Sequence, residues 1–161
     1  ATALWAYSVM TIGRGVAEAT AGLSVTAYWG SLMAGRILFG LVADRVPLVP
    51  ALRVAIVTSA LGAILFWIGS PWVLSLAGLM LMGLGLAPVF ASLISLTAGR
   101  VGQEHAASAI GFQIAAAGLR GAILTALVGV VGDEIGLELV GASLFGIVVL
   151  LLAAYEAFVR R

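Results

Sequence analysis

Five long and nearly uninterrupted apolar runs constrain the fold of this chain more than any other feature. A helix needs about 20 mostly apolar residues to cross a bilayer. The strands of membrane barrels instead alternate apolar and polar residues over about ten positions. The chain is therefore predicted to be an all-α membrane protein with five complete transmembrane helices. The predicted spans are residues 22–43, 52–69, 71–98, 106–131 and 137–158.

The composition favours lipid rather than water as the solvent of this chain. Of its 161 residues, 63% are hydrophobic and only 9% are charged, whereas soluble domains carry about 25% charged residues. The net charge of +1 provides no field that would attract nucleic acid. The lack of cysteine excludes disulfides and thiolate metal sites. The expected partner is the lipid bilayer, and no cofactor, metal or nucleic acid is expected.

The segment ahead of the first span, residues 1–12, is apolar but too short to cross a bilayer. We interpret it as the end of a helix, so that residues 1–161 form a single transmembrane half-bundle. No basic region precedes the apolar stretch, so a signal peptide is not indicated. A fragment of a longer protein is the simpler interpretation of this pattern, and a genuine half-length protein is the alternative.

The arginines sort to one side of the predicted bundle. Alternating spans place Arg14 on one side, together with the turn between the second and third spans. The opposite side carries five arginines, at positions 45, 53, 100, 160 and 161. The positive-inside rule makes this arginine-rich side cytoplasmic, and the C-terminus with it. Glu156 and Arg160 are also spaced to pair as i,i+4 neighbours on that side.

The first complete span ends abruptly in GLVADR, residues 40–45. Gly40 has no side chain, so a neighbouring helix can approach it closely. Asp44 follows one turn later, where its carboxylate can cap the N-terminus of a partner helix. Arg45 can reach headgroups or another carboxylate, and Arg36 lies two turns deeper on about the same face. We predict a latch or gate from these four residues; ordinary loop charges are the alternative.

Residues 40–45 resemble the signature loop of the major facilitator superfamily, in which Gly, three residues and Asp precede a basic residue. Residues 84–97 (LGLAPVFASLISLT) and 109–124 (AIGFQIAAAGLRGAIL) resemble helices ten and eleven of its sugar-permease-like branch, which includes fucose permeases. Residues 46–48 (VPL) replace the later Gly and basic residues of the full motif, which suits the weaker copy after helix eight. The resemblance covers essentially the whole chain.

This resemblance implies the C-terminal half of a carrier, from the end of helix seven to helix twelve, in a bacterial inner membrane. The implied function is secondary active transport of a small solute by alternating access, with a missing N-terminal half as the partner. The alternative is a non-transporting membrane module that pairs through small-residue helix faces. No catalytic constellation or phosphate loop occurs in the sequence, so an enzyme is not expected.

Arg120 is the outstanding polar residue inside a span, close to the middle of residues 106–131. An arginine at that depth costs about 3 kcal/mol. Gln113 lies two turns earlier on nearly the same face. We predict that both line the central pathway, where the planar guanidinium of Arg120 suits an anionic or polyhydroxylated substrate. Pairing with an acid in the missing half, or a position nearer the outer interface, is the alternative.

Three further residues are candidates for the pathway or its gate. Pro88 removes a backbone hydrogen bond within the third span and should bend it, as a gating hinge or as a static kink. Tyr28 and Trp5 offer aromatic faces on which a flat ligand could stack. Anchoring of both rings at the membrane interface is the alternative role.

Overall fold

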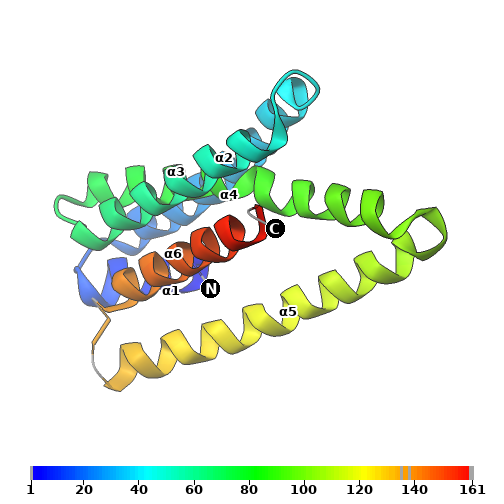
Figure 1. The fold of residues 1–161 in the computed structure, drawn as a ribbon. Helices are drawn as coiled ribbons and strands as arrows, with labels where there is room; N and C mark the ends of the chain where they lie inside the picture. The colour runs from blue at the N-terminus through cyan, green and yellow to red at the C-terminus, as the bar shows by residue number, and fades with distance from the viewer. Residues whose placement is uncertain (1, 135, 138, 160–161) are drawn as a thin grey trace.

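The computed structural model describes residues 2–134, 136–137 and 139–159; side chains at 93, 95, 96, 98–100, 103, 131, 133, 158 and 159 lie outside the description. The chain is about 90% helical, and the described residues contain no strand. The helices run up and down in sequence order (Figure 1). They are α1 (Thr2–Ser8), the π-helical η1 (Val9–Gly13), α2 (Glu18–Val42), α3 (Leu48–Ile68), α4 (Trp72–Val101), α5 (Gln103–Glu134) and α6 (Leu139–Val159).

Five helices are long and apolar enough to cross a membrane, which confirms the five predicted spans among the described residues. The chain is therefore best described as an integral membrane protein. Two helices begin four residues before the predicted starts of their spans, α2 at Glu18 and α3 at Leu48. The early start of α3 includes Pro50. Proline is tolerated there because the N–H groups of the first helical turn have no intrahelical acceptor.

Helix α4 is the centre of the packed part of the molecule, and it touches both neighbours through glycine. A Cβ atom on Gly62 of α3 would lie 2.6 Å from the carbonyl oxygen of Gly78 of α4. On the other side, a Cβ atom on Gly83 would lie 2.6 Å from the carbonyl oxygen of Tyr28 of α2. Small residues let helix backbones approach closely in lipid, so α2, α3 and α4 form one tight three-helix layer.

The two ends of the bundle differ in shape. The Arg14 end, with the connections at residues 14–17 and 69–71, gathers the helix ends together (Figure 1). The Arg45 end, with the connections at residues 43–47 and 102, spreads apart, because the α2–α3 turn and the α4–α5 turn point in different directions. The bundle is therefore open at the end that carries Arg45.

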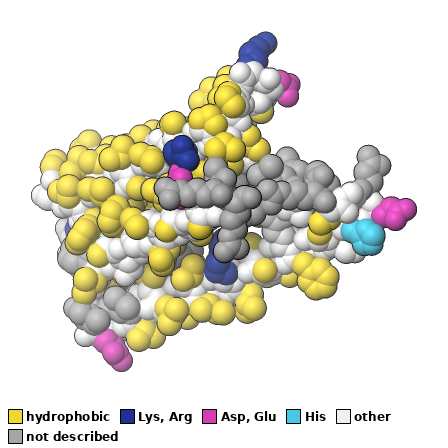
Figure 2. All heavy atoms as spheres, in the orientation of Figure 1, with side chains coloured by type: hydrophobic (Ala, Val, Ile, Leu, Met, Phe, Trp, Pro, Cys, Tyr) yellow, Lys and Arg dark blue, Asp and Glu magenta, His cyan; other side chains and the backbone are white. Residues whose placement is uncertain are grey.

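The outer surface matches a lipid environment. Figure 2 shows hydrophobic side chains over much of the visible face, with most acidic side chains near its extremities. Leu23 and Met33 of α2 and Val54 of α3 are all about two-thirds exposed. Apolar side chains that would be a liability in water are the expected surface of a helix that faces hydrocarbon.

Candidate functional site

Arg120 lies in a cavity between the last three helices. The cavity has a volume of about 470 Å³ and is walled by α4, α5 and α6, with Thr2 of α1 at one end. Arg120 is the one charged side chain among the described residues that line it. The rest of the lining is almost entirely apolar, with Met82, Leu86 and Leu124 among its members. The side chain of Arg120 is itself exposed, so the predicted pathway residue lines an open cavity on the α4–α5–α6 side of the bundle.

Gln113 does not share that cavity, although it lies on the same face of α5. Its Oε1 accepts a hydrogen bond of 3.0 Å from the hydroxyl of Thr97, which joins α5 to α4. The side chain is half-buried. The predicted polar stripe therefore has two parts with different neighbours: Gln113 ties two helices together, and Arg120 is presented to open space.

The two aromatic candidates are packed within the bundle. The indole N–H of Trp5 donates to the carbonyl oxygen of Thr125 of α5 at 3.1 Å, and its ring lies against Gly129. Tyr28 is only 6% exposed. The centroid of its ring lies 5.4 Å from that of the Trp29 ring, and the two rings are arranged edge to face. Neither ring is among the described residues that line the Arg120 cavity. A stacking role for them stays a prediction.

The predicted latch lies at the Arg45 end. The described residues show no partner helix for Asp44 to cap. Gly40, Asp44, Arg45 and Arg36 are all exposed. A Cβ atom on Gly40 would meet nothing within 4 Å, so α3 to α6 leave this glycine open. The backbone N–H of Arg45 bonds to the carbonyl oxygen of Val42 and closes the turn that presents Asp44. The latch stays a prediction that requires a further helix.

Pro88 lies inside α4, which continues through it as a helix. The residue is buried and lines a cavity of about 360 Å³ together with Gly35 of α2 and Ala55 of α3. The C-terminal part of α4 runs away from α2 and α3 toward its turn with α5 (Figure 1). A hinge role for Pro88 stays a prediction.

Sequence reasoning assigned Arg14 only a place in the topology, but the structure makes it a connecting residue. Its guanidinium donates to the hydroxyl of Ser75 at 2.8 Å and to the carbonyl oxygen of Trp67 at 3.2 Å. It also lies 5.1 Å from the ring centroid of Phe66. The hydroxyl of Ser75 donates in turn to the carbonyl oxygen of Gly69. Arg14 thus joins the α1–α2 connection to the α3–α4 turn.

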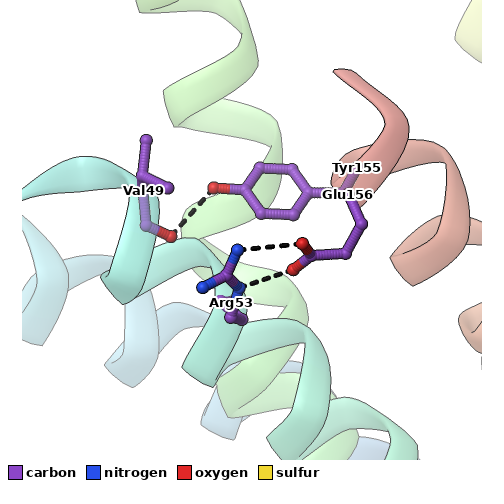
Figure 3. Close-up of polar contacts among 4 residues, drawn as sticks. All are labelled: Val49, Arg53, Tyr155 and Glu156. Atoms are coloured by element: carbon purple, nitrogen blue, oxygen red, sulfur yellow. Dashed lines mark hydrogen bonds and ion pairs between the residues drawn. The ribbon is translucent and has the colours of Figure 1, made fainter. Parts of the chain in front are cut away.

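A second connection, also absent from the sequence predictions, joins α3 to α6 (Figure 3). Arg53 donates to both carboxylate oxygens of Glu156, at 2.5 and 2.9 Å. The hydroxyl of Tyr155 donates to the carbonyl oxygen of Val49 at 2.8 Å. The partner of Glu156 is therefore Arg53 on another helix; the predicted partner, Arg160, lies outside the described residues. We name these four residues the α3–α6 clasp.

Comparison of the chain with known protein families, with curated proteins and with solved structures finds no match. Within the described part of the chain, no group of three or more His, Cys, Asp or Glu side chains is placed to hold a metal ion. The functional argument therefore rests on the Arg120 cavity and on the arrangement of the helices.

Proposed function

We propose that this chain is the C-terminal half of a secondary active transporter of the major facilitator type, which moves a small solute by alternating access. The observation that carries the proposal is Arg120, a charged side chain at mid-span that lines a cavity between α4, α5 and α6. Ionisable residues inside a membrane are costly and commonly mark substrate or ion pathways. The resemblance of residues 40–45, 84–97 and 109–124 to that superfamily adds support.

In this proposal the chain supplies one wall of a site near the bilayer midplane, and a second half-bundle supplies the other. The solute is a small molecule with an anionic or polyhydroxylated group for Arg120. The arginine-rich Arg45 end is cytoplasmic, the C-terminus lies on that side, and the membrane is a bacterial inner membrane. Arg36, Gly40, Asp44 and Arg45 close that end against the missing half in one state, and Pro88 serves as the hinge.

The direct test is solute uptake by the complete carrier with Arg120→Ala. We expect at least about a tenfold loss of uptake, which corresponds to about 1.4 kcal/mol of lost transition-state stabilisation, with the protein still present in the membrane. Glu104→Ala, which alters an exposed charged residue of α5 outside the cavity lining, is the comparison for a general effect of removing charge. Normal uptake by Arg120→Ala would reduce Arg120 to a structural role at most.

A second candidate function is a non-transporting module that assembles through small-residue faces. The observation in its favour is a set of glycines on α2 and α5 around which a Cβ atom would meet nothing within 4 Å, namely Gly22, Gly30, Gly111 and Gly118. The coding sequence upstream of Ala1 separates the two functions. Six further apolar spans in frame support the transporter, and a start codon immediately before Ala1 supports the module.

A further inference from the structure

Helices α2 and α5 each carry an arginine within the span and no carboxylate near it. Arg36 is the one charged residue of α2 after Glu18, and Arg120 is the one charged residue of α5 between residues 106 and 132. Both side chains are exposed. Among the described residues, neither guanidinium has an ion-pair partner. Charges inside a membrane are costly unless they are paired or face a pathway, so both arginines favour the entry of negative charge.

Thr2 connects the surroundings of the two arginines. It lines the cavity that holds Arg120. Its side chain also forms a hydrogen bond with the side chain of Tyr28 of α2, on which α1 packs. The charge of Arg36 in turn acts on the phenol of Tyr28. Two hydroxyl groups therefore connect the arginine of α2 with the arginine of α5.

Arg36 is directed toward these hydroxyl groups rather than toward the Arg45 end. The side chains of an α-helix point back toward its N-terminus, so the guanidinium of Arg36 reaches from its backbone position toward Tyr28. Asp44 lies two turns away in the other direction, and Arg36 forms no ion pair with it, although both residues are described. In this state Arg36 is therefore associated with Tyr28 and Thr2 rather than with Asp44.

We propose that Arg36 and Arg120, with the hydroxyl groups of Thr2 and Tyr28, form one anion-binding site, which we name the two-arginine site. A guanidinium group binds carboxylate or phosphate oxygens through paired N–H donors, and a hydroxyl group can donate one further hydrogen bond. The inference rests on the proposed function in one respect, because it narrows the solute from an anionic or polyhydroxylated molecule to an anion. Binding of an anion at these four residues itself requires no transport.

The test uses the 161-residue chain, which has no cysteine, with one thiol introduced by Thr2→Cys. Its reaction with an anionic reagent, sulfonatoethyl methanethiosulfonate, is compared with its reaction with a cationic one, trimethylammonioethyl methanethiosulfonate. The ratio of the two rates reports the local electrostatic potential, because the reactivity of the thiol itself cancels. Relative to a free thiol in the same buffer, we expect the ratio to favour the anionic reagent by about tenfold.

Each arginine should contribute to that preference for the anionic reagent. Arg36→Gln and Arg120→Gln should each lower the preference about threefold or more, whereas Arg36→Lys, which keeps the charge, should retain it. Arg100→Gln, which removes the same charge close to the end of α4, is the control and should have no effect. The proposal is overturned if the thiol reacts with neither reagent, or if Arg36→Gln leaves the ratio unchanged.

Sodium sulfate distinguishes a binding site from a merely positive field. A sulfate ion bound in the two-arginine site neutralises its field, so sulfate should lower the anionic preference below its value in sodium chloride of equal ionic strength. This excess effect should vanish in Arg36→Gln. Equal effects of the two salts would overturn the proposal. Loss of the preference when a cysteine-free complementary half-bundle is added would also overturn it, because a carboxylate of that half would then pair with the arginines. None of these results depends on solute movement, so the proposed function can hold where this inference fails.

Discussion

Helices α4 and α5 are consecutive, similar in length and rich in glycine, yet their surroundings are opposite. In the most apolar stretch of each, 44% of α4 is buried but only 11% of α5. Gly78, Gly83 and Gly85 of α4 lie against backbone atoms of α2 and α3, whereas Gly111 and Gly118 of α5 face open space. The apolar composition thus determines that a helix enters the membrane. Its packing partners determine whether its glycines contact a neighbouring helix backbone or open space.

The most demanding test of this difference between α4 and α5 is to make the same substitution in both helices. Gly78→Leu should destabilise the chain by about 3 kcal/mol, because overpacking a tight contact costs about 1–3 kcal/mol or more and the Gly62 carbonyl oxygen lies on the backbone. Gly118→Leu should change the stability by less than about 0.5 kcal/mol. Unfolding in mixed micelles by added detergent measures both. Equal losses would show that α5 is as tightly packed as α4.

The second prediction concerns the attachment of α5 to the rest of the chain. Trp5→Ala should destabilise the chain by about 2 kcal/mol, somewhat less than the 3–5 kcal/mol for a fully buried tryptophan, because the ring is half-buried. Trp5→Phe keeps a ring against Gly129 but loses the hydrogen bond to Thr125, and should cost about 1 kcal/mol. The same unfolding measurement applies. An unaffected Trp5→Ala variant would mean that α5 is held elsewhere.

A third prediction concerns the connection that Arg14 makes at its end of the bundle. Ser75 is fully buried and joins Arg14 to the carbonyl oxygen of Gly69. Ser75→Ala should cost about 1–2 kcal/mol, because it removes two hydrogen bonds that each contribute about 0.5–1.5 kcal/mol. Ser143→Ala, which removes an exposed bond within α6, is the control. The assignment of Arg14 as a connecting residue fails if both variants lose the same free energy of unfolding.

The smallest effect is expected at the α3–α6 clasp. Arg53→Gln should cost less than about 1 kcal/mol, because ion pairs open to water contribute about 0–1 kcal/mol. The loss should shrink as salt screens the pair. A double-mutant cycle with Glu156→Gln isolates the interaction between the two side chains. A coupling energy above about 1 kcal/mol, or one that does not change with salt concentration, would indicate that lipid shields the pair.

The helices were predictable because their apolar runs are long, and length and composition suffice to select a spanning helix. The predicted starts of α2 and α3 were each four residues late, because a helix continues past its apolar stretch into polar residues such as Glu18. The sequence also placed Arg120 in the middle of a span, and the structure gives it a cavity.

The contacts of the site were not predictable. Arg14 and Ser75 are 61 residues apart, and Arg53 and Glu156 are 103 apart. Such pairs depend on which helices become neighbours, and that order does not follow from apolar runs. For the same reason the sequence favoured Arg160, four residues away, as the partner of Glu156. Local spacing identifies possible pairs within a helix but says nothing about a competing residue on another helix.

Solute flux into liposomes that contain only the 161-residue chain tests the central claim most directly. We expect no flux above protein-free liposomes, because in the proposed carrier α5 and Arg120 supply only one wall of the pathway and a second half-bundle supplies the other. Flux should appear when the complementary half-bundle is present in the same membrane, and Arg120→Ala should abolish it. Saturable flux by the chain alone, shown to be monomeric in the same liposomes, would contradict the account.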